Sequence, residues 1–384
     1  MPFDFESTIN RQNTWSTKWG KYSNPDVIPM WVADMDFETA PVIKEALLNR
    51  VQHGIFGYTK PTRELNQTVC QYLKRDFEWA IDEDWIVWLP SLVVGLSVVS
   101  RAFANKGEGV LTNVPIYPPF LSAPRLGGRE TITAPLTKSK NRWVMDFDAL
   151  DEAITAQTRV MLFCSPHNPT GRVWDREELR ELVSFCHKHN LVLVSDEIHS
   201  GLIMDIDKKH IPSATINEAE DLTVTLLSAS KTFNLPGLGC AFAIIKNPTL
   251  RKQMQKTMAG IVHHVGALGY TATFAALKDG QDWQIALVDY LRENRELVER
   301  SFHDYRFFNV NHTEATYLSW IDVRDMPMEN PANYFEQHGV GLYDGADFGA
   351  PGFLRVNFAC PRPLLKSAID RITDALENAD AEIR

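Results

Sequence analysis

Three apolar runs, each followed at once by polar residues, decide the fold: VMLFCSPHNPTG at 160–171, LVLVSDEIH at 191–199 and TVTLLSASKT at 223–232. Each apolar run has the length of a β-strand. Between the first two lies DREELRELVSFCHKH at 175–189, a helix-like stretch that is acidic early and basic late. Continuous apolar strands that alternate with helices predict an α/β protein with a largely parallel sheet, covered by helices on both faces.

The chain around these units supplies further elements and a second kind of pattern. Before residue 250 we expect helices and strands at 41–50, 92–104, 109–112 and 241–245. Beyond it the pattern becomes α+β, with helices and strands expected at 249–278, 282–303, 316–323, 353–358 and 362–380. A chain of 384 residues exceeds the roughly 250–300 at which a single core stops growing. We therefore predict a large domain at 41–280 and a small domain formed by both chain ends, 1–40 and 281–384.

Composition excludes several classes of protein. The chain has 39 Lys and Arg against 49 Asp and Glu, a formal charge of −10, which argues against nucleic-acid or anionic-membrane partners. No apolar run reaches the roughly 18–20 residues of a membrane span, and the N-terminus lacks the features of a secretion signal. The five cysteines are scattered and never spaced C-x-x-C, which favours reduced thiols in the cytoplasm.

The residues that follow the three strands carry the chemistry. Asn168, Asp196 and Lys231 follow successive strands, so they deliver an amide, a carboxylate and an amine towards one crevice. Each feature alone is common, but together they match the requirements of pyridoxal phosphate: an amine for a Schiff base, a partner for the pyridinium N–H and donors to a phosphate. The histidines lack the spacing of a metal site, so no metal is expected.

Several longer stretches make the assignment more specific. They read TKW at 17–19, IPMWVADMDF at 28–37, FGY at 56–58, PIYPPF at 115–120, DEIH at 196–199, SKTFN at 230–234 and RVNFACP at 355–361. With them the chain resembles, nearly end to end, the fold-type I pyridoxal-phosphate enzymes of the class I/II aminotransferase superfamily. More narrowly, it resembles the MalY/PatB branch of cystathionine β-lyases, or C–S lyases. The resemblance implies a mostly parallel seven-stranded sheet in the large domain, and a smaller α+β domain.

The resemblance also implies roles for residues around the cofactor ring. Lys231 is expected to hold the cofactor covalently and to act as the catalytic base, and Asp196 to pair with the pyridine nitrogen. Asn168 is expected to donate to the 3′ oxygen of the ring, and Tyr117 to stack on the ring face. His199 occupies a position where other members of the superfamily present a tyrosine to the ring oxygen. It is expected either to contact the cofactor or reacting atoms, or to be a structural histidine.

The cofactor phosphate is expected at the start of the helix at 92–104, on the amides of Val93 and Val94, because helix N-termini bind anions. The hydroxyl of Ser228 adds a donor, and Ser230 is a weaker candidate. Gly239 stands where many relatives place Arg, Lys or Asn on the phosphate.

Three further residues are expected to reach the substrate or the partner subunit. By resemblance, Arg355 grips the α-carboxylate of an amino-acid substrate in a bidentate fork, and Asp36 also lies at the substrate. Tyr58 matches a residue that reaches the phosphate and substrate of the other subunit, which implies a homodimer with shared active sites.

The implied reaction is α,β-elimination on cystathionine or a related cysteine S-conjugate, which releases a thiol, pyruvate and ammonia. An aminotransferase that uses an amino acid and a 2-oxo acid shares every residue named above, so it remains an alternative. A non-catalytic regulator that keeps the fold is a weaker alternative, because the set Lys231, Asp196, Asn168 and Arg355 is complete.

Overall fold

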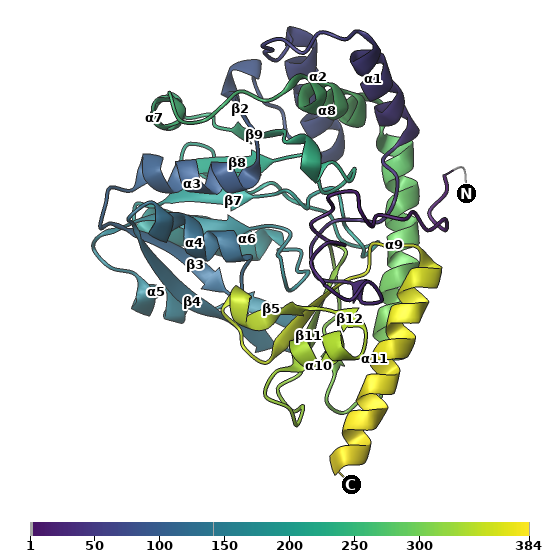
Figure 1. Cartoon of the computed structure of the whole chain (residues 1–384). Helices are drawn as coiled ribbons and strands as arrows, with labels where there is room; N and C mark the ends of the chain where they lie inside the picture. Colours follow the sequence, from purple (N-terminus) through teal and green to yellow (C-terminus); the bar gives the residue numbers. More distant parts are fainter. Residues whose placement is uncertain (1–2, 141, 384) are drawn as a thin grey trace.

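The computed structural model describes residues 3–140 and 142–383, and it is built around a mixed sheet of eight strands (Figure 1). Their order is β2-β9-β8-β7-β6-β3-β4-β5. Neighbours from β8 to β4 run parallel, whereas β9 is antiparallel to β2 and β8, and β5 is antiparallel to β4. The strands are β2 (Ile86–Leu89), β3 (Gly109–Val114), β4 (Glu130–Ser139), β5 (Arg142–Met145), β6 (Thr158–Cys164), β7 (Val192–Asp196), β8 (Thr223–Leu227) and β9 (Ala241–Ile244).

The mostly parallel α/β sheet predicted from the sequence is confirmed, but it has eight strands where seven were expected. The edge strand β5 follows β4 after a turn at Lys140, whose φ of 48° is left-handed, and pairs back on it. Parallel strands need a long crossover, whereas an antiparallel edge strand needs only such a turn.

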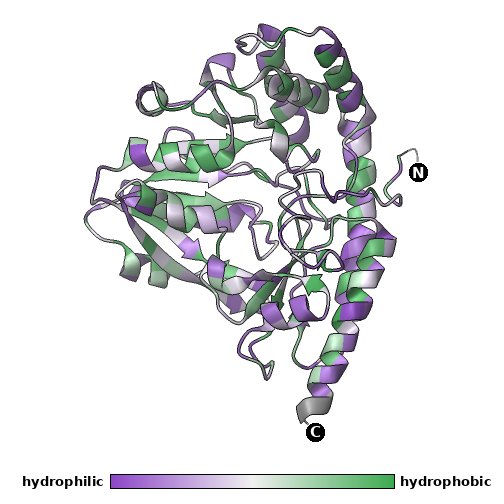
Figure 2. Cartoon of the chain, viewed as in Figure 1, coloured by the Kyte–Doolittle hydropathy of each residue, from purple (hydrophilic) through white to green (hydrophobic). Residues whose placement is uncertain are grey.

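Helices cover both faces of the sheet, as its apolar strands require. Alternate residues of β6 face opposite sides: Val160 and Leu162 pack in the core beneath α3 (Leu92–Phe103) and α4 (Pro118–Leu126). Met161 and Phe163 pack instead in the core beneath α6 (Arg176–Lys188). Figure 2 shows α3 as predominantly hydrophobic, in keeping with its place against the sheet.

A second sheet lies in the C-terminal part of the chain, in the order β10-β11-β14-β13. Its antiparallel strands are β10 (Asn309–Val310), β11 (Leu318–Asp322), β13 (Tyr343–Asp344) and β14 (Phe353–Asn357). A separate parallel pair, β1 (Ile28–Pro29) with β12 (Val340–Gly341), ties the N-terminal segment to this region. The N-terminal segment, purple in Figure 1, consequently crosses the middle of the molecule between the large sheet and α11.

The remaining helices complete the architecture: α1 (Pro41–Gln52), α2 (Arg63–Phe77), α5 (Phe147–Ala153), α7 (Pro248–Met258), α8 (Ala267–Asp279), α9 (Gln281–Ser301), α10 (Pro331–Gln337) and α11 (Arg362–Ile383). The single helix expected at 249–278 is two helices, because Gly260 adopts a left-handed φ of 76° after α7 and Gly266 caps α8. No helix among the described residues combines the length and apolarity needed to cross a bilayer.

Candidate active site

The ends of β6, β7 and β8 open on a cavity of about 380 Å³. Asn168, Asp196 and Lys231 line it together, as the order of the three strand–loop units predicts. Arg355 reaches the same cavity from β14 of the second sheet, so the two sheets both contribute to one site. The arrangement follows the general behaviour of open α/β sheets, which collect ligands at the carboxyl ends of their strands.

The Lys231 amine lies in this cavity, and no carboxylate among the described residues forms an ion pair with it. Its Nζ donates a hydrogen bond of 2.6 Å to the backbone oxygen of Ala33, in the N-terminal segment. Burial disfavours the charged form and lowers the pKa of Lys231 to about 8, although the charge of Asp34 opposes the shift. A substantial fraction of the amine is therefore neutral near physiological pH, as a nucleophile or base requires.

The carboxylate of Asp196 ends β7 and is 4% exposed. Its Oδ1 accepts a hydrogen bond of 3.1 Å from the backbone N–H of Ile198, and no cationic side chain among the described residues forms an ion pair with it. Burial accordingly raises the pKa of Asp196 to about 7. A ligand that brings a protonated ring nitrogen would supply the missing positive partner.

The guanidinium of Arg355 is a buried cation with a similar deficit. Its Nη1 donates to Oδ1 of Asn168 at 2.9 Å and its Nη2 to the backbone oxygen of Trp31 at 2.8 Å. The central guanidinium carbon, Cζ, lies 4.9 Å from the ring centre of Tyr343. The Nε of Arg355 has no hydrogen-bond partner among the described residues. Burial lowers the pKa of Arg355 to about 10. Because neither neutral oxygen compensates the charge, the guanidinium suits an incoming carboxylate.

Two ring-bearing residues predicted for the site also line the cavity. Tyr117 immediately precedes α4, and its backbone N–H donates to the backbone oxygen of Asn168 at 3.2 Å. His199 is 2% exposed, and its Nδ1 has no hydrogen-bond partner. Burial, together with the nearby charges of Lys231 and Arg355, holds the pKa of His199 well below its ordinary value. His199 is therefore a neutral imidazole with unused hydrogen-bonding capacity, which is uncommon for a buried side chain.

The expected phosphate end of the cavity contains the start of α3 and two hydroxyls. Val93, Ser228 and Ser230 line it, and Ser228 Oγ lies 2.7 Å from the backbone oxygen of Cys240. Val94 is placed differently: its N–H donates to Oγ of Ser91, which caps the helix. The donors that remain for an anion at this end are backbone groups and hydroxyls, because Gly239 contributes no side chain.

Two residues predicted for the substrate do not line the cavity. Tyr58 is fully exposed in this single chain. Asp36 is buried away from the cavity and binds Lys18 Nζ at 2.6 Å, Arg11 Nη1 at 2.8 Å and Trp19 Nε1 at 2.8 Å. The carboxylate of Asp36 belongs to a buried network that fixes the N-terminal segment, and its expected place at the substrate stays a prediction.

The segment of residues 31–37, which we call the strap, contacts the site through its backbone, and this role was not predicted from the sequence. Its backbone oxygens accept hydrogen bonds from Lys231 and Arg355. Asn357 Nδ2, two residues after Arg355, donates to the backbone oxygens of Val32 and Asp34 at 2.6 and 2.8 Å. The stretch WVADMDF was recognised, but backbone acceptors leave no mark in a sequence. Tyr343, from the short strand β13, was also missed, since nothing in its neighbourhood signals a site.

Within the described part of the chain, the cavity presents a carboxylate without a cation, a guanidinium without an anion, an amine of lowered pKa and an imidazole whose Nδ1 lacks a hydrogen bond. Pyridoxal phosphate fits this set: Lys231 would hold its aldehyde, Asp196 would pair with its ring nitrogen, and the start of α3 would hold its phosphate. Arg355 would bind the carboxylate of an amino acid. The donor set thus complements both a cofactor and a substrate.

Comparisons with known proteins cover nearly the whole chain. Residues 25–372 match the family model described as aminotransferase class I and II. Cystathionine β-lyase PatB of Bacillus subtilis (strain 168) is 32% identical over 386 residues, which cover 97% of this chain and 100% of PatB. The crystal structure of OvoB gives a TM-score of 0.95 at 39% identity, over 97% of this chain and 99% of OvoB. Cystalysin from Treponema denticola, which contains pyridoxal 5′-phosphate, gives 0.94 at 32% identity, over 98% and 100% of the two chains.

The lowered pKa of Lys231 can be tested by its reactivity. Reductive methylation requires a neutral amine, so in cofactor-free protein its rate at Lys231 should rise as the pH passes about 8. Peptide mass spectrometry over a pH series measures the rate, and the exposed Lys252 in the same digest reports on the reagent. A midpoint at the ordinary lysine value of 10.5 would contradict the described desolvation.

Proposed function

Because the chain belongs to the class I and II aminotransferase family, we propose that it is a pyridoxal-phosphate-dependent C–S β-lyase of the MalY/PatB branch. Its substrate is cystathionine or a related cysteine S-conjugate, and water converts this thioether into a thiol, pyruvate and ammonia. The convergence of Lys231, Asp196, Asn168 and Arg355 on one cavity is the observation that carries the proposal. The name of PatB and the cofactor of cystalysin support it independently.

When bound, pyridoxal phosphate supplies an electron-withdrawing ring that stabilises negative charge developing at Cα of the substrate. Asp196 would pair with the N–H of the ring nitrogen, and this positive partner would favour ionisation of the buried carboxylate. Asn168 would donate to the ring hydroxyl through Nδ2, because its Oδ1 is already engaged by Arg355. Tyr117 would pack on the ring face, and the start of α3 would hold the phosphate.

Arg355 binds the α-carboxylate and so fixes the orientation of the substrate. Lys231, once its Nζ is free, removes the proton from Cα, and desolvation keeps enough of the amine neutral for this task. The hydrogen bond from Lys231 to Ala33 provides a defined resting position for that free amine. The electron pair from the Cα–H bond forms a Cα–Cβ double bond, and the Cβ–S bond breaks to release the thiolate.

The reaction test compares elimination with amino-group transfer. Purified holoenzyme should release pyruvate and thiol in equal amounts from cystathionine or S-alkyl cysteines, as followed by a coupled pyruvate assay and a thiol reagent. Lys231→Ala should lose turnover by about 10²-fold or more, because general acid–base catalysis alone contributes 10²–10⁴. Lys252→Ala, an exposed lysine on α7, is the matched control and should keep wild-type rates.

The opposite outcome is equally clear. Alanine and a 2-oxo acid test for transfer under the same conditions. If amino groups are exchanged while no pyruvate or thiol appears from any of the thioethers, the lyase assignment is wrong and the protein is an aminotransferase.

We further propose that the enzyme is a homodimer with shared sites and acts in the cytoplasm. Exposed apolar side chains support the dimer: Phe56 and Tyr58 follow α1, and Val93 and Ile261 border a groove of about 330 Å³ between α3 and the end of α7. Exposed apolar side chains that gather at one groove, as Val93 and Ile261 do, are typical of protein–protein interfaces. The five cysteines, all free, are consistent with a reducing compartment.

The dimer has its own test in light scattering coupled to size exclusion. Wild-type protein should elute with twice the mass of one chain, and Ile261→Asp should shift the equilibrium to monomer because it places a charge in the apolar patch. Ile206→Asp is the matched control, since Ile206 is 85% exposed and lies outside that patch. A wild-type monomer, or equal behaviour of the two variants, would contradict the proposed interface.

A further inference from the structure

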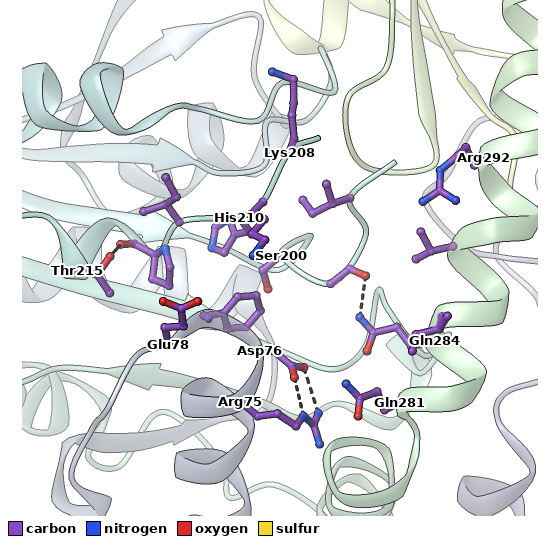
Figure 3. A pocket seen from close by; sticks show the side chains of 18 of the residues that line it. Arg75, Asp76, Glu78, Ser200, Lys208, His210, Thr215, Gln281, Gln284 and Arg292 are labelled. Atoms are coloured by element: carbon purple, nitrogen blue, oxygen red, sulfur yellow. Dashed lines mark hydrogen bonds and ion pairs between the residues drawn. The ribbon is translucent and has the colours of Figure 1, made fainter. Parts of the chain in front are cut away.

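A second large groove lies outside the candidate active site. It measures about 800 Å³ and is bordered by the end of α2, the first half of α9 and the loop at 200–215 (Figure 3). It shares no lining residue with the cofactor cavity. Ser200 and Gly201 form part of its wall, and they directly follow the DEIH motif. Its size lies in the range of small-molecule sites.

A buried histidine in this groove has one unused nitrogen. His210 is 7% exposed, and its Nε2 lies 2.8 Å from Oε2 of the fully buried Glu197. In the singly protonated ring the proton is assigned to Nε2, because the carboxylate can only accept there, and Nδ1 is then a hydrogen-bond acceptor. Nδ1 has no partner within the described part of the chain, and it is not sealed from the groove that His210 lines. It is therefore available to a donor on a ligand.

The charges of the groove divide into paired and unpaired groups. Asp76 is paired with Arg75 at 2.5 Å, and Asp289 with Arg292 at 2.7 Å. By contrast, three lining residues form no ion pair within the described residues: the carboxylate Glu78 and the cations Lys209 and Arg176. Figure 3 places Glu78 and His210 on the same side of the groove, opposite α9.

This inventory specifies the charge pattern of a ligand. A group that donates hydrogen bonds and carries positive charge is complementary to His210 Nδ1 and Glu78, and a carboxylate is complementary to Lys209 and Arg176. Apolar surface from Ile285 and Val288 of α9 is available to a side chain. We propose that the groove is a second ligand site that binds a free α-amino acid as its zwitterion. The proposal is independent of the reaction assigned to the cofactor cavity.

The position of the groove joins it to the catalytic loop. Gln284 Nε2 donates to the backbone oxygen of Gly201 at 2.9 Å, a bond visible in Figure 3. A Cβ on Gly201 would lie 2.7 Å from Oγ1 of Thr232, the residue after Lys231, so this wall is packed directly against the lysine loop. Glu197, the partner of His210, is the residue after Asp196. An amino acid bound here thus lies directly behind both catalytic loops.

Calorimetry on holoenzyme reduced with borohydride tests the proposal, because reduction prevents amino acids from reacting at the cofactor. L-methionine is the probe and should bind saturably at low ionic strength, where exposed charges are least screened. N-acetyl-L-methionine lacks the ammonium and L-methioninamide lacks the carboxylate. Both analogues should bind at least about fivefold more weakly, the loss expected for one exposed charge pair.

Matched variants assign any binding to the groove. Lys209→Met and Glu78→Gln each remove one exposed charge, and each should weaken L-methionine binding by about fivefold. Lys252→Met removes a comparable exposed charge on α7 and should leave binding unchanged. Absence of L-methionine binding would overturn the proposal. So would binding that both groove variants leave intact, or equal affinity for the zwitterion and its two analogues.

Discussion

The burial of uncompensated charge is the constraint on which the architecture of the site depends. Asp196 and Arg355 are almost completely buried, yet neither forms an ion pair with another described residue. Burying a charge without a partner is costly, and that cost appears as the raised pKa of Asp196 and the lowered pKa of Arg355. A cofactor with a protonated ring nitrogen and a substrate with a carboxylate would relieve both deficits. The same two buried charges would therefore both strengthen the binding of cofactor and substrate and set their orientation in the cavity.

The strap shows how the chain ends complete a site that the sheet begins. The backbone oxygens of Trp31 and Ala33 accept hydrogen bonds from Arg355 and Lys231. These oxygens orient the two cationic side chains but, being uncharged, do not neutralise them. Asp36 anchors the strap from behind through the buried Lys18. The pairing of β1 with β12 then fixes the strap to the region that carries β14 and Arg355. The catalytic geometry thus depends on contacts between residues more than 300 positions apart.

The sequence predicted the parts of the fold and site that follow from local pattern. The apolar runs of β6, β7 and β8 determine both the parallel sheet and the side chains at its carboxyl ends, which is why Asn168, Asp196 and Lys231 could be named in advance. Arg355 came from family resemblance, because a lone arginine on a strand has no local signature.

The features that could not be predicted depend on backbone groups or on contacts distant in sequence. The acceptors on Trp31 and Ala33 are main-chain atoms, which every residue possesses. The buried network of Asp36 could not be predicted, because its partners Arg11, Lys18 and Trp19 are recognised only once the segment is folded. The eighth strand and the break between α7 and α8 each depend on a turn with a left-handed residue, Lys140 or Gly260. Neither residue on its own indicates where the chain goes after the turn. The most direct measurement is peptide mapping of holoenzyme after borohydride reduction. The account predicts a pyridoxyl-phosphate mass on the peptide that contains Lys231, whereas that mass on another lysine, or on none, would contradict it.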